Sequence, residues 1–450
     1  MARGQPQQQQ RRQQQQPRDL PAYLLCFVGA VFFNMLSGNS RLLGFPIGPD
    51  RLLFGAGLTL LLLDHAAWRQ LRLLLRPVHV FSLAVIGLAT WSAYEHGTLG
   101  TSLGFYALLD RLAVPFLTFA LAPVIFSTPA RRDVLLRCLV VMGLYLGATA
   151  IFEMVGPKSL VYPRFILDPN VGIQFGRARG PFTASEADGI AMLQCGFAAA
   201  FASTRLPGAW KLLSRIAVAL CAVGVLLTLT RSVWVGTGLG VVLACVLTRG
   251  LRKFLLPLVA AAALVVAVAF AAVPGLKAKA TTRATTQRSV HDRQNTDAAA
   301  LRIIERHPLT GVGWLRFIEV DQAYVRQAHN YPITNIDIEV HNVPLSRMAE
   351  LGIPGGTLWL LAVLAGPCLV LFRRAPHGDL AGWRVASIGG TGCWLVAIML
   401  SPVPYPLPNL LVWLESGIAL IPYLAAPRPS QDGGYASREV VQRTPDAVAF

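Results

Sequence analysis

Long apolar stretches separated by short polar segments run through the chain from residue 20 to residue 426. An α-helix needs roughly 17–25 mainly apolar residues to cross the hydrocarbon core of a bilayer. The pattern therefore predicts an all-α polytopic membrane protein with about twelve transmembrane helices. The predicted spans are residues 20–37, 50–64, 78–95, 102–126, 133–155, 187–204, 212–229, 232–248, 254–273, 343–372, 385–401 and 408–426.

Composition supports the same interpretation. Hydrophobic residues make up 54% of the 450 residues and charged residues only 14%. A water-soluble domain carries about 25% charged residues, so the excess of apolar side chains must face lipid. The cysteines all lie inside apolar stretches, so we expect small buried side chains rather than disulfides or metal ligands. They are Cys26, Cys138, Cys195, Cys221, Cys245, Cys368 and Cys393.

Basic residues are distributed unevenly between the two sides of the predicted membrane. The segments on the side of the N-terminus contain 21 Lys and Arg residues, whereas the short connections on the other side contain 3. Because connections rich in Lys and Arg stay in the cytoplasm, this asymmetry places the N-terminus there. An even number of helices places the C-terminus there as well.

This orientation divides the chain into consecutive regions with different surroundings. They are a disordered, basic, Gln-rich cytoplasmic leader (1–19), helices one to nine (20–273) with an external loop (155–186), a large external loop (274–342), helices ten to twelve (343–426) and a cytoplasmic tail (427–450). Loops longer than about 12–15 residues are usually functional or disordered. In the larger loop, Asp297–Arg306 has the apolar spacing of a short helix, which Pro308 and Gly311 would end.

Arginines gather at the predicted outer surface. Arg177 and Arg179 lie in the stretch Gly176–Phe182, ahead of the sixth span, and Arg231 lies in the short turn between spans seven and eight. Guanidinium groups stay charged and grip phosphate oxygens with two parallel hydrogen bonds. These arginines therefore suit an anionic lipid head group such as a diphosphate. The alternative is that they reach to phospholipid phosphates, which we favour for Arg41 and Arg51.

His341 begins the tenth predicted span and is the candidate general base. Asn342 can cap this helix, and Pro344 is tolerated in a first helical turn. The positive end of the helix would disfavour the protonated imidazole, and a general base must be neutral. Taken alone, a histidine at this place can also be a solvated loop residue.

Asp110 and Arg111 lie inside the fourth predicted span. Paired charges at membrane depth are candidates for function, and the alternative is a structural tie between helices. The sequence has no cluster with metal-ligand spacing and no phosphate-binding glycine loop. We therefore expect no metal or other cofactor, and no nucleic acid as a partner.

Several of these motifs together resemble a known family. His341-Asn342, followed by Glu350 and Gly352 in an apolar helix, is similar to the histidine–asparagine signature of the O-antigen ligase and polymerase superfamily. Pro308–Gly313 resembles the Pro-x-x-Gly-x-Gly segment of the family's large loop, and Arg293 lies at the spacing of a family arginine.

The motifs around Arg231 and Arg177 are also similar to family patterns. The resemblance covers roughly residues 170–360 and is closest to the O-antigen ligases. One departure is the pair Ser185-Glu186, where the family frequently has Pro-Asn.

The resemblance implies a glycosyltransferase of the bacterial inner membrane with its site on the periplasmic side. It would transfer a glycan from undecaprenyl diphosphate to the lipid A–core oligosaccharide, without a metal and with inversion. His341 would be the general base, and Arg231, Arg177, Arg179 and Arg293 would bind the diphosphate. Asn342, Asp110, Arg111 and Glu350 would support them.

Two alternatives remain open at this point. A polymerase would use a second lipid-linked repeat as acceptor instead of lipid A–core. A transporter with twelve helices belongs to another class, but transporters usually bind substrate near the midplane between internal repeats. The chain shows no such repeat, and its unusual residues gather on one face. The oligomeric state is open.

Overall fold

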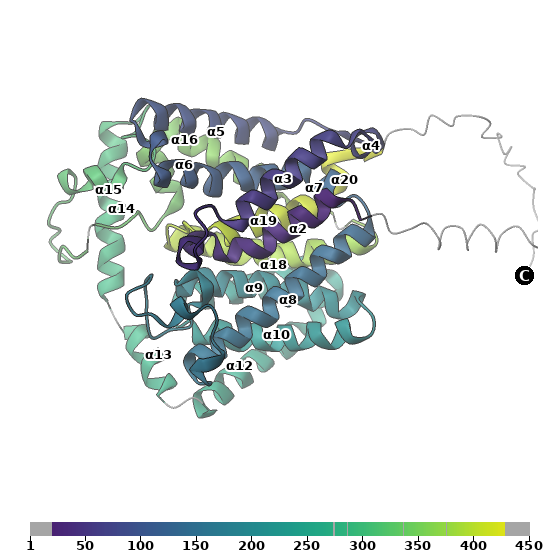
Figure 1. Ribbon diagram of the computed structural model, residues 1–450. Coiled ribbons are helices and arrows are strands. Elements are labelled where there is room, and N and C mark those ends of the chain that lie inside the picture. The colour runs from purple at the N-terminus through teal and green to yellow at the C-terminus, as the bar shows by residue number, and fades with distance from the viewer. Residues whose placement is uncertain (1–19, 273–274, 286, 336, 375, 428–450) are drawn as a thin grey trace, which may run out of the picture.

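The computed structural model describes residues 20–272, 275–285, 287–335, 337–374 and 376–427. The predicted leader (1–19) and the tail from residue 428 onward lie outside the described residues. The described chain is mostly helical (Figure 1). Its strands are β1 (Leu71–Leu73) and β2 (Ala425–Pro427), which pair in antiparallel orientation.

The main helices follow the predicted apolar stretches. They are α2 (Ala22–Phe33), α3 (Pro49–Leu63), α4 (His65–Gln70), α5 (Pro77–Glu95), α6 (Ser102–Leu108), α7 (Val114–Ile125), α8 (Pro129–Met154), α9 (Ser185–Arg205), α10 (Ala209–Leu227), α11 (Arg231–Leu247), α12 (Leu255–Ala272), α13 (Leu276–Thr285), α14 (Arg288–Arg306), α15 (Phe317–Val320), α16 (Val343–Ala365), α17 (Leu369–Phe372), α18 (Asp379–Leu400), α19 (Pro406–Ala419) and α20 (Ile421–Leu424). Short 3₁₀ segments are η1 (Asn34–Leu43), η2 (Thr98–Gly100), η4 (Lys158–Leu160), η5 (Arg164–Leu167), η6 (Gly180–Phe182), η7 (Arg249–Phe254) and η8 (Asp321–Ala323), and η3 (Leu109–Ala113) is a π-helix.

Eight helical stretches in the described part of the chain are long and apolar enough to cross a membrane. They are Ala22–Leu43, Pro77–Glu95, Ser102–Ile125, Pro129–Met154, Ala209–Leu227, Arg249–Ala271, Val343–Phe372 and Asp379–Leu400. This agrees with the prediction of an all-α membrane protein. The other four predicted spans are also helical, as α3, α9, α11 and α19 with α20, but they are shorter or more polar. The count of twelve crossings stays a prediction.

Two helices form the centre of the bundle. α9 packs against α8, α10 and α18, and α18 packs in turn against α11 and α19. Most of the cysteines are buried, as predicted. Those fully buried are Cys195, Cys221, Cys245, Cys368 and Cys393, while Cys26 and Cys138 are partly buried.

The helix α16 is broken at Gly352, where the backbone has φ 72° and ψ 172°. The segment Pro308–Gly313 inserts at this break: Ile353 N–H donates to the Pro308 carbonyl at 2.7 Å. In return, Gly313 N–H donates to the Glu350 carbonyl at 3.0 Å. A Cβ on Gly352 would lie 2.2 Å from the Leu309 carbonyl oxygen, so only glycine fits. The Pro-x-x-Gly-x-Gly motif thus satisfies backbone groups that the broken helix leaves open.

We expect Gly352→Ala to lower the free energy of unfolding by about 2 kcal/mol or more, because it combines left-handed strain with a backbone clash. Denaturant unfolding in detergent, followed by tryptophan fluorescence, measures the change. The matched control is Gly55→Ala in α3, where an added methyl group meets no atom within 4 Å. A comparable loss in both variants would contradict the role assigned to Gly352.

Candidate functional site

The polar residues of interest gather at one end of the bundle. Figure 1 shows α14 and α15 at this end, whereas α4 and α20 lie at the opposite end. The helix α14 was predicted in part: it ends at Arg306, ahead of Pro308, but it begins at Arg288 rather than Asp297. It packs against α16 and so lies close to the residues at the start of that helix.

His341 directly precedes the N-cap of α16. The Asn342 side chain accepts a hydrogen bond from Leu345 N–H at 3.1 Å, which confirms the predicted cap. The His341 Nδ1 atom lies 3.1 Å from the Glu339 carbonyl oxygen. A carbonyl only accepts, so Nδ1 carries the hydrogen in this contact, and a neutral ring then leaves a lone pair on Nε2. Burial, with the nearby positive charge of Arg293, lowers the pKa of His341 below its ordinary value.

Three arginines are linked to this histidine, one directly and two through their own contacts. Arg231 is the first residue of α11 and donates to Ser289 Oγ of α14 at 2.8 Å. Arg293 lies one turn further along α14 and interacts electrostatically with both Arg231 and His341. Arg177 reaches the same region from the loop 155–186, where it interacts with Glu186. We call Arg177, Arg231 and Arg293 the arginine cluster.

Glu186 is a buried carboxylate of this region. It lies in the first turn of α9, is 6% exposed, and interacts electrostatically with Arg293 and Arg177. Its Oε1 atom accepts a hydrogen bond from Ser232 Oγ at 2.9 Å, and its Oε2 atom accepts one from Ser401 Oγ. The sequence marked Glu186 only as a departure from the family pattern and assigned it no role.

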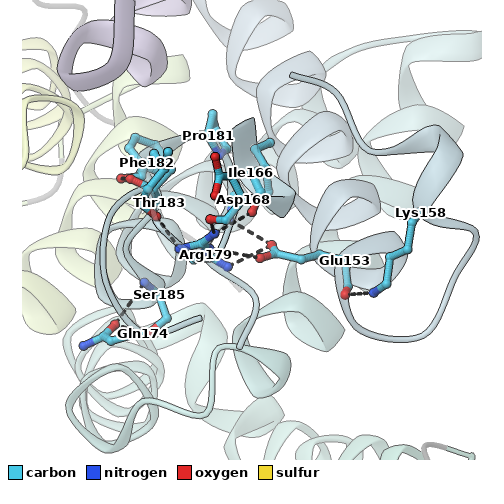
Figure 2. Close-up of polar contacts among 12 residues, drawn as sticks. Glu153, Lys158, Ile166, Asp168, Gln174, Arg179, Pro181, Phe182, Thr183 and Ser185 are labelled. Atoms are coloured by element: carbon cyan, nitrogen blue, oxygen red, sulfur yellow. Dashed lines mark hydrogen bonds and ion pairs between the residues drawn. The ribbon is translucent and has the colours of Figure 1, made fainter. Parts of the chain in front are cut away.

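Arg179 has surroundings unlike those of Arg177. Its side chain is fully buried, and Figure 2 shows its guanidinium group enclosed by the loop. It donates to the carbonyls of Ile166, at 2.8 Å, Asp168 and Val171, and lies 3.7 Å from a Glu153 carboxylate oxygen. The other Glu153 oxygen accepts the backbone N–H of Arg179 at 2.9 Å. We therefore assign Arg179 to the fold of the loop 155–186 rather than to direct contact with a diphosphate.

Residues 216–360 match the family model described as O-antigen ligase. By this similarity we refer to residues 216–360 as the O-antigen ligase domain. This match confirms the resemblance inferred from the motifs. None of the curated proteins matches the chain. The matched region contains Arg231, Arg293 and His341, whereas Arg177 and Glu186 lie ahead of it. The family supports the general function of a membrane enzyme of the O-antigen ligase and polymerase type.

Two further charges lie ahead of the matched region. Asp110 and Arg111 lie on η3. The sequence suggested that they pair with each other, but each forms its ion pair with a residue of another segment. Asp110 forms an ion pair with Arg51 of α3 at 2.8 Å, so Arg51 is held by the protein and does not reach to phospholipid phosphates as predicted. Arg111 makes a two-pronged ion pair with Glu339, at 2.8 and 2.7 Å. Because these partners lie on other segments, both residues act as ties between elements.

Inside the domain, Glu350 has a similar structural contact. It pairs with Arg347 at 2.9 Å within the first half of α16, and both side chains are buried. The Arg347 guanidinium group also lies 4.6 Å from the centre of the Trp314 ring. Among the residues that the structure describes, no group of three or more His, Cys, Asp or Glu side chains could hold a metal ion.

The tie between Arg111 and Glu339 positions the backbone that holds His341. Burial alone would raise the pKa of Glu339, but the ion pair with Arg111 lowers it overall. The side chains of Arg111 and Glu339 are 7% and 26% exposed, so water competes little for the hydrogen bonds of this ion pair. Sequence reasoning missed Glu339, which lies 228 residues from Arg111.

We expect Glu339→Gln to lower the free energy of unfolding by about 3 kcal/mol, because it leaves the Arg111 charge buried without its carboxylate. Denaturant unfolding in detergent measures this loss. The double variant Arg111→Met with Glu339→Gln should recover most of it, since no buried charge then lacks a partner. Equal losses in the single and double variants would contradict this account.

Proposed function

We propose that this protein is a glycosyltransferase of the bacterial inner membrane with both termini in the cytoplasm. It transfers an O-antigen glycan from undecaprenyl diphosphate to a sugar hydroxyl of the lipid A–core oligosaccharide on the periplasmic side. The observation that carries the proposal is Arg293, which interacts with both His341 and Arg231 inside the O-antigen ligase domain. A base and several phosphate-binding groups therefore meet at one end of a membrane helix bundle.

In the proposed reaction, a sugar hydroxyl of the acceptor attacks the anomeric carbon of the donor glycan. The Nε2 atom of His341 takes the hydroxyl proton as the new carbon–oxygen bond forms. The bond between the anomeric carbon and the diphosphate oxygen breaks, and its electron pair stays on that oxygen. Direct displacement of this kind inverts the anomeric configuration.

The arginine cluster would stabilise the charge that develops on the leaving diphosphate. Arg231 and Arg293 belong to the matched domain, and Arg177 joins them from the loop 155–186. Guanidinium groups held in place before the reaction need little rearrangement at the moment of bond cleavage, which makes such stabilisation effective. The arginines supply the positive charge, so the proposed step uses no metal ion.

The other residues that the sequence predicted at the site have structural roles in this proposal. Asn342 caps the helix behind the base, and Arg111 holds Glu339, whose carbonyl contacts His341. Glu350 and Arg347 stabilise the first half of α16. Asp110 and Arg179 act further away, on η3 and on the loop 155–186.

Reconstitution tests the proposed function. The purified protein is placed in liposomes with a glycan linked to undecaprenyl diphosphate, and lipid A–core or a second lipid-linked repeat is offered as acceptor. We expect one transfer step to lipid A–core, with an inverted linkage. A growing ladder on the lipid-linked repeat would identify a polymerase instead. Absence of transfer to both, with movement of the donor across the bilayer, would favour a transporter.

A further inference from the structure

Glu186 connects several segments at the site. Its two carboxylate oxygens receive hydrogen bonds from Ser232, next to Arg231 in α11, and from Ser401, directly after α18. The side chain is almost completely buried, so bulk water screens its charge poorly. A carboxylate held in this way lies at a fixed place beside the arginine cluster.

The charges facing Glu186 are positive. Arg293 and Arg177 both interact with it, and Arg231 interacts in turn with Arg293. Asp292 and Asp297 flank Arg293 on α14, but each lies on the same helix as Arg293. Glu186 is therefore the acidic side chain that reaches the arginine cluster from the helix bundle.

The reaction itself explains why such a carboxylate would be useful. Cleavage leaves on the diphosphate an oxygen that carries more negative charge than it did in the donor. A cluster of arginines consequently attracts the product more strongly than the donor. A further carboxylate fixed beside the cluster weakens this attraction, so that the product does not stay bound and limit turnover.

We propose that Glu186 is a positioning residue that fixes the affinity of the arginine cluster for the leaving group, so that the polyprenyl diphosphate product can dissociate after transfer. This inference rests on the proposed function. It assigns to Glu186 a role in product release and none in proton transfer. The charge of Glu186, rather than its hydrogen bonds alone, carries the effect.

The test compares Glu186→Gln with the unaltered protein in binding of undecaprenyl diphosphate. We expect the variant to bind this lipid about tenfold to a hundredfold more tightly, as removal of a nearby unit charge predicts. Multiple turnover should then slow, whereas a single turnover at saturating acceptor should keep its rate or rise. A residue that only maintained the fold would lower both rates and weaken binding.

Control variants separate charge from structure. Ser232→Ala and Ser401→Ala each remove one hydrogen bond and keep the carboxylate, so binding should stay within about threefold. Glu186→Asn, a shorter amide, replaces the glutamine variant if that variant does not fold. Glu415→Gln removes a fully buried carboxylate from α19 and should leave binding of the lipid unchanged.

The outcomes distinguish this inference from the proposed function. If the unaltered protein binds undecaprenyl diphosphate no better than undecaprenol, the proposed function is wrong. If it binds the diphosphate, but Glu186→Gln and Glu186→Asn match its affinity within about threefold, the role of Glu186 is wrong and the proposed function stands.

Discussion

His341→Ala is expected to lower the rate of glycan transfer by about a thousandfold, because the acceptor hydroxyl then loses its general base. Asn342 still caps α16, so the variant should fold and remain in the membrane. Initial rates in proteoliposomes measure the loss, and the amount of folded protein is determined by size-exclusion chromatography. The matched control is His329→Ala, which changes an exposed histidine of the same loop.

The pH dependence of transfer tests the same role. Burial and Arg293 lower the pKa of His341 from its ordinary value of 6.5, so the neutral base persists below that pH. The rate should therefore rise with pH through an acid limb below pH 6.5 and stay level above it. Replacing Arg293 with Gln removes a positive neighbour, so the limb should move to higher pH. His341 would be removed from the mechanism by near-normal transfer in His341→Ala, or by an acid limb that stays at the same pH in Arg293→Gln.

The apolar pattern predicted the helices better than the breaks within them. Each predicted span contains a helix, because long runs of apolar side chains have one stable form in a bilayer. The π-helix η3 and the break at Gly352 were not predicted, since apolar stretches lie on both sides of each and read as one continuous span. α14 begins earlier than predicted because its first turns are polar and show no apolar spacing.

The candidate site was predictable by residue type, but not by partner. His341 and Arg231 were identified because a histidine before a helix and an arginine in a tight turn are unusual in an apolar chain. Glu339 was missed because its partner, Arg111, is remote in sequence. Arg177 and Arg179 are two residues apart, yet only the fold shows that Arg179 is enclosed by carbonyls while Arg177 interacts with Glu186.

Arg231→Lys is expected to lower kcat/KM for the lipid-linked donor by about tenfold to a hundredfold. Lysine keeps the positive charge but has no planar fork, so it loses paired hydrogen bonds to phosphate oxygens. The lysine side chain is also shorter, so the hydrogen bond to Ser289 that connects α11 to α14 is weakened. Hydrogen bonds to charged groups are worth about 1.5–3 kcal/mol, which gives the expected range. Initial rates at varied donor concentration measure the change.

The control for this substitution is Arg41→Lys, which alters an exposed arginine on η1 that we expect to face phospholipid. It should change the rate of transfer by less than about twofold, because at an exposed site a lysine ammonium group binds a lipid phosphate almost as well as an arginine guanidinium group does. If both lysine variants transfer normally, Arg231 is a lipid contact and the diphosphate must be held by Arg293 and Arg177. If only Arg231→Lys fails, hydrogen-bond geometry in addition to charge is required at the first turn of α11, where the leaving group would gain its negative charge.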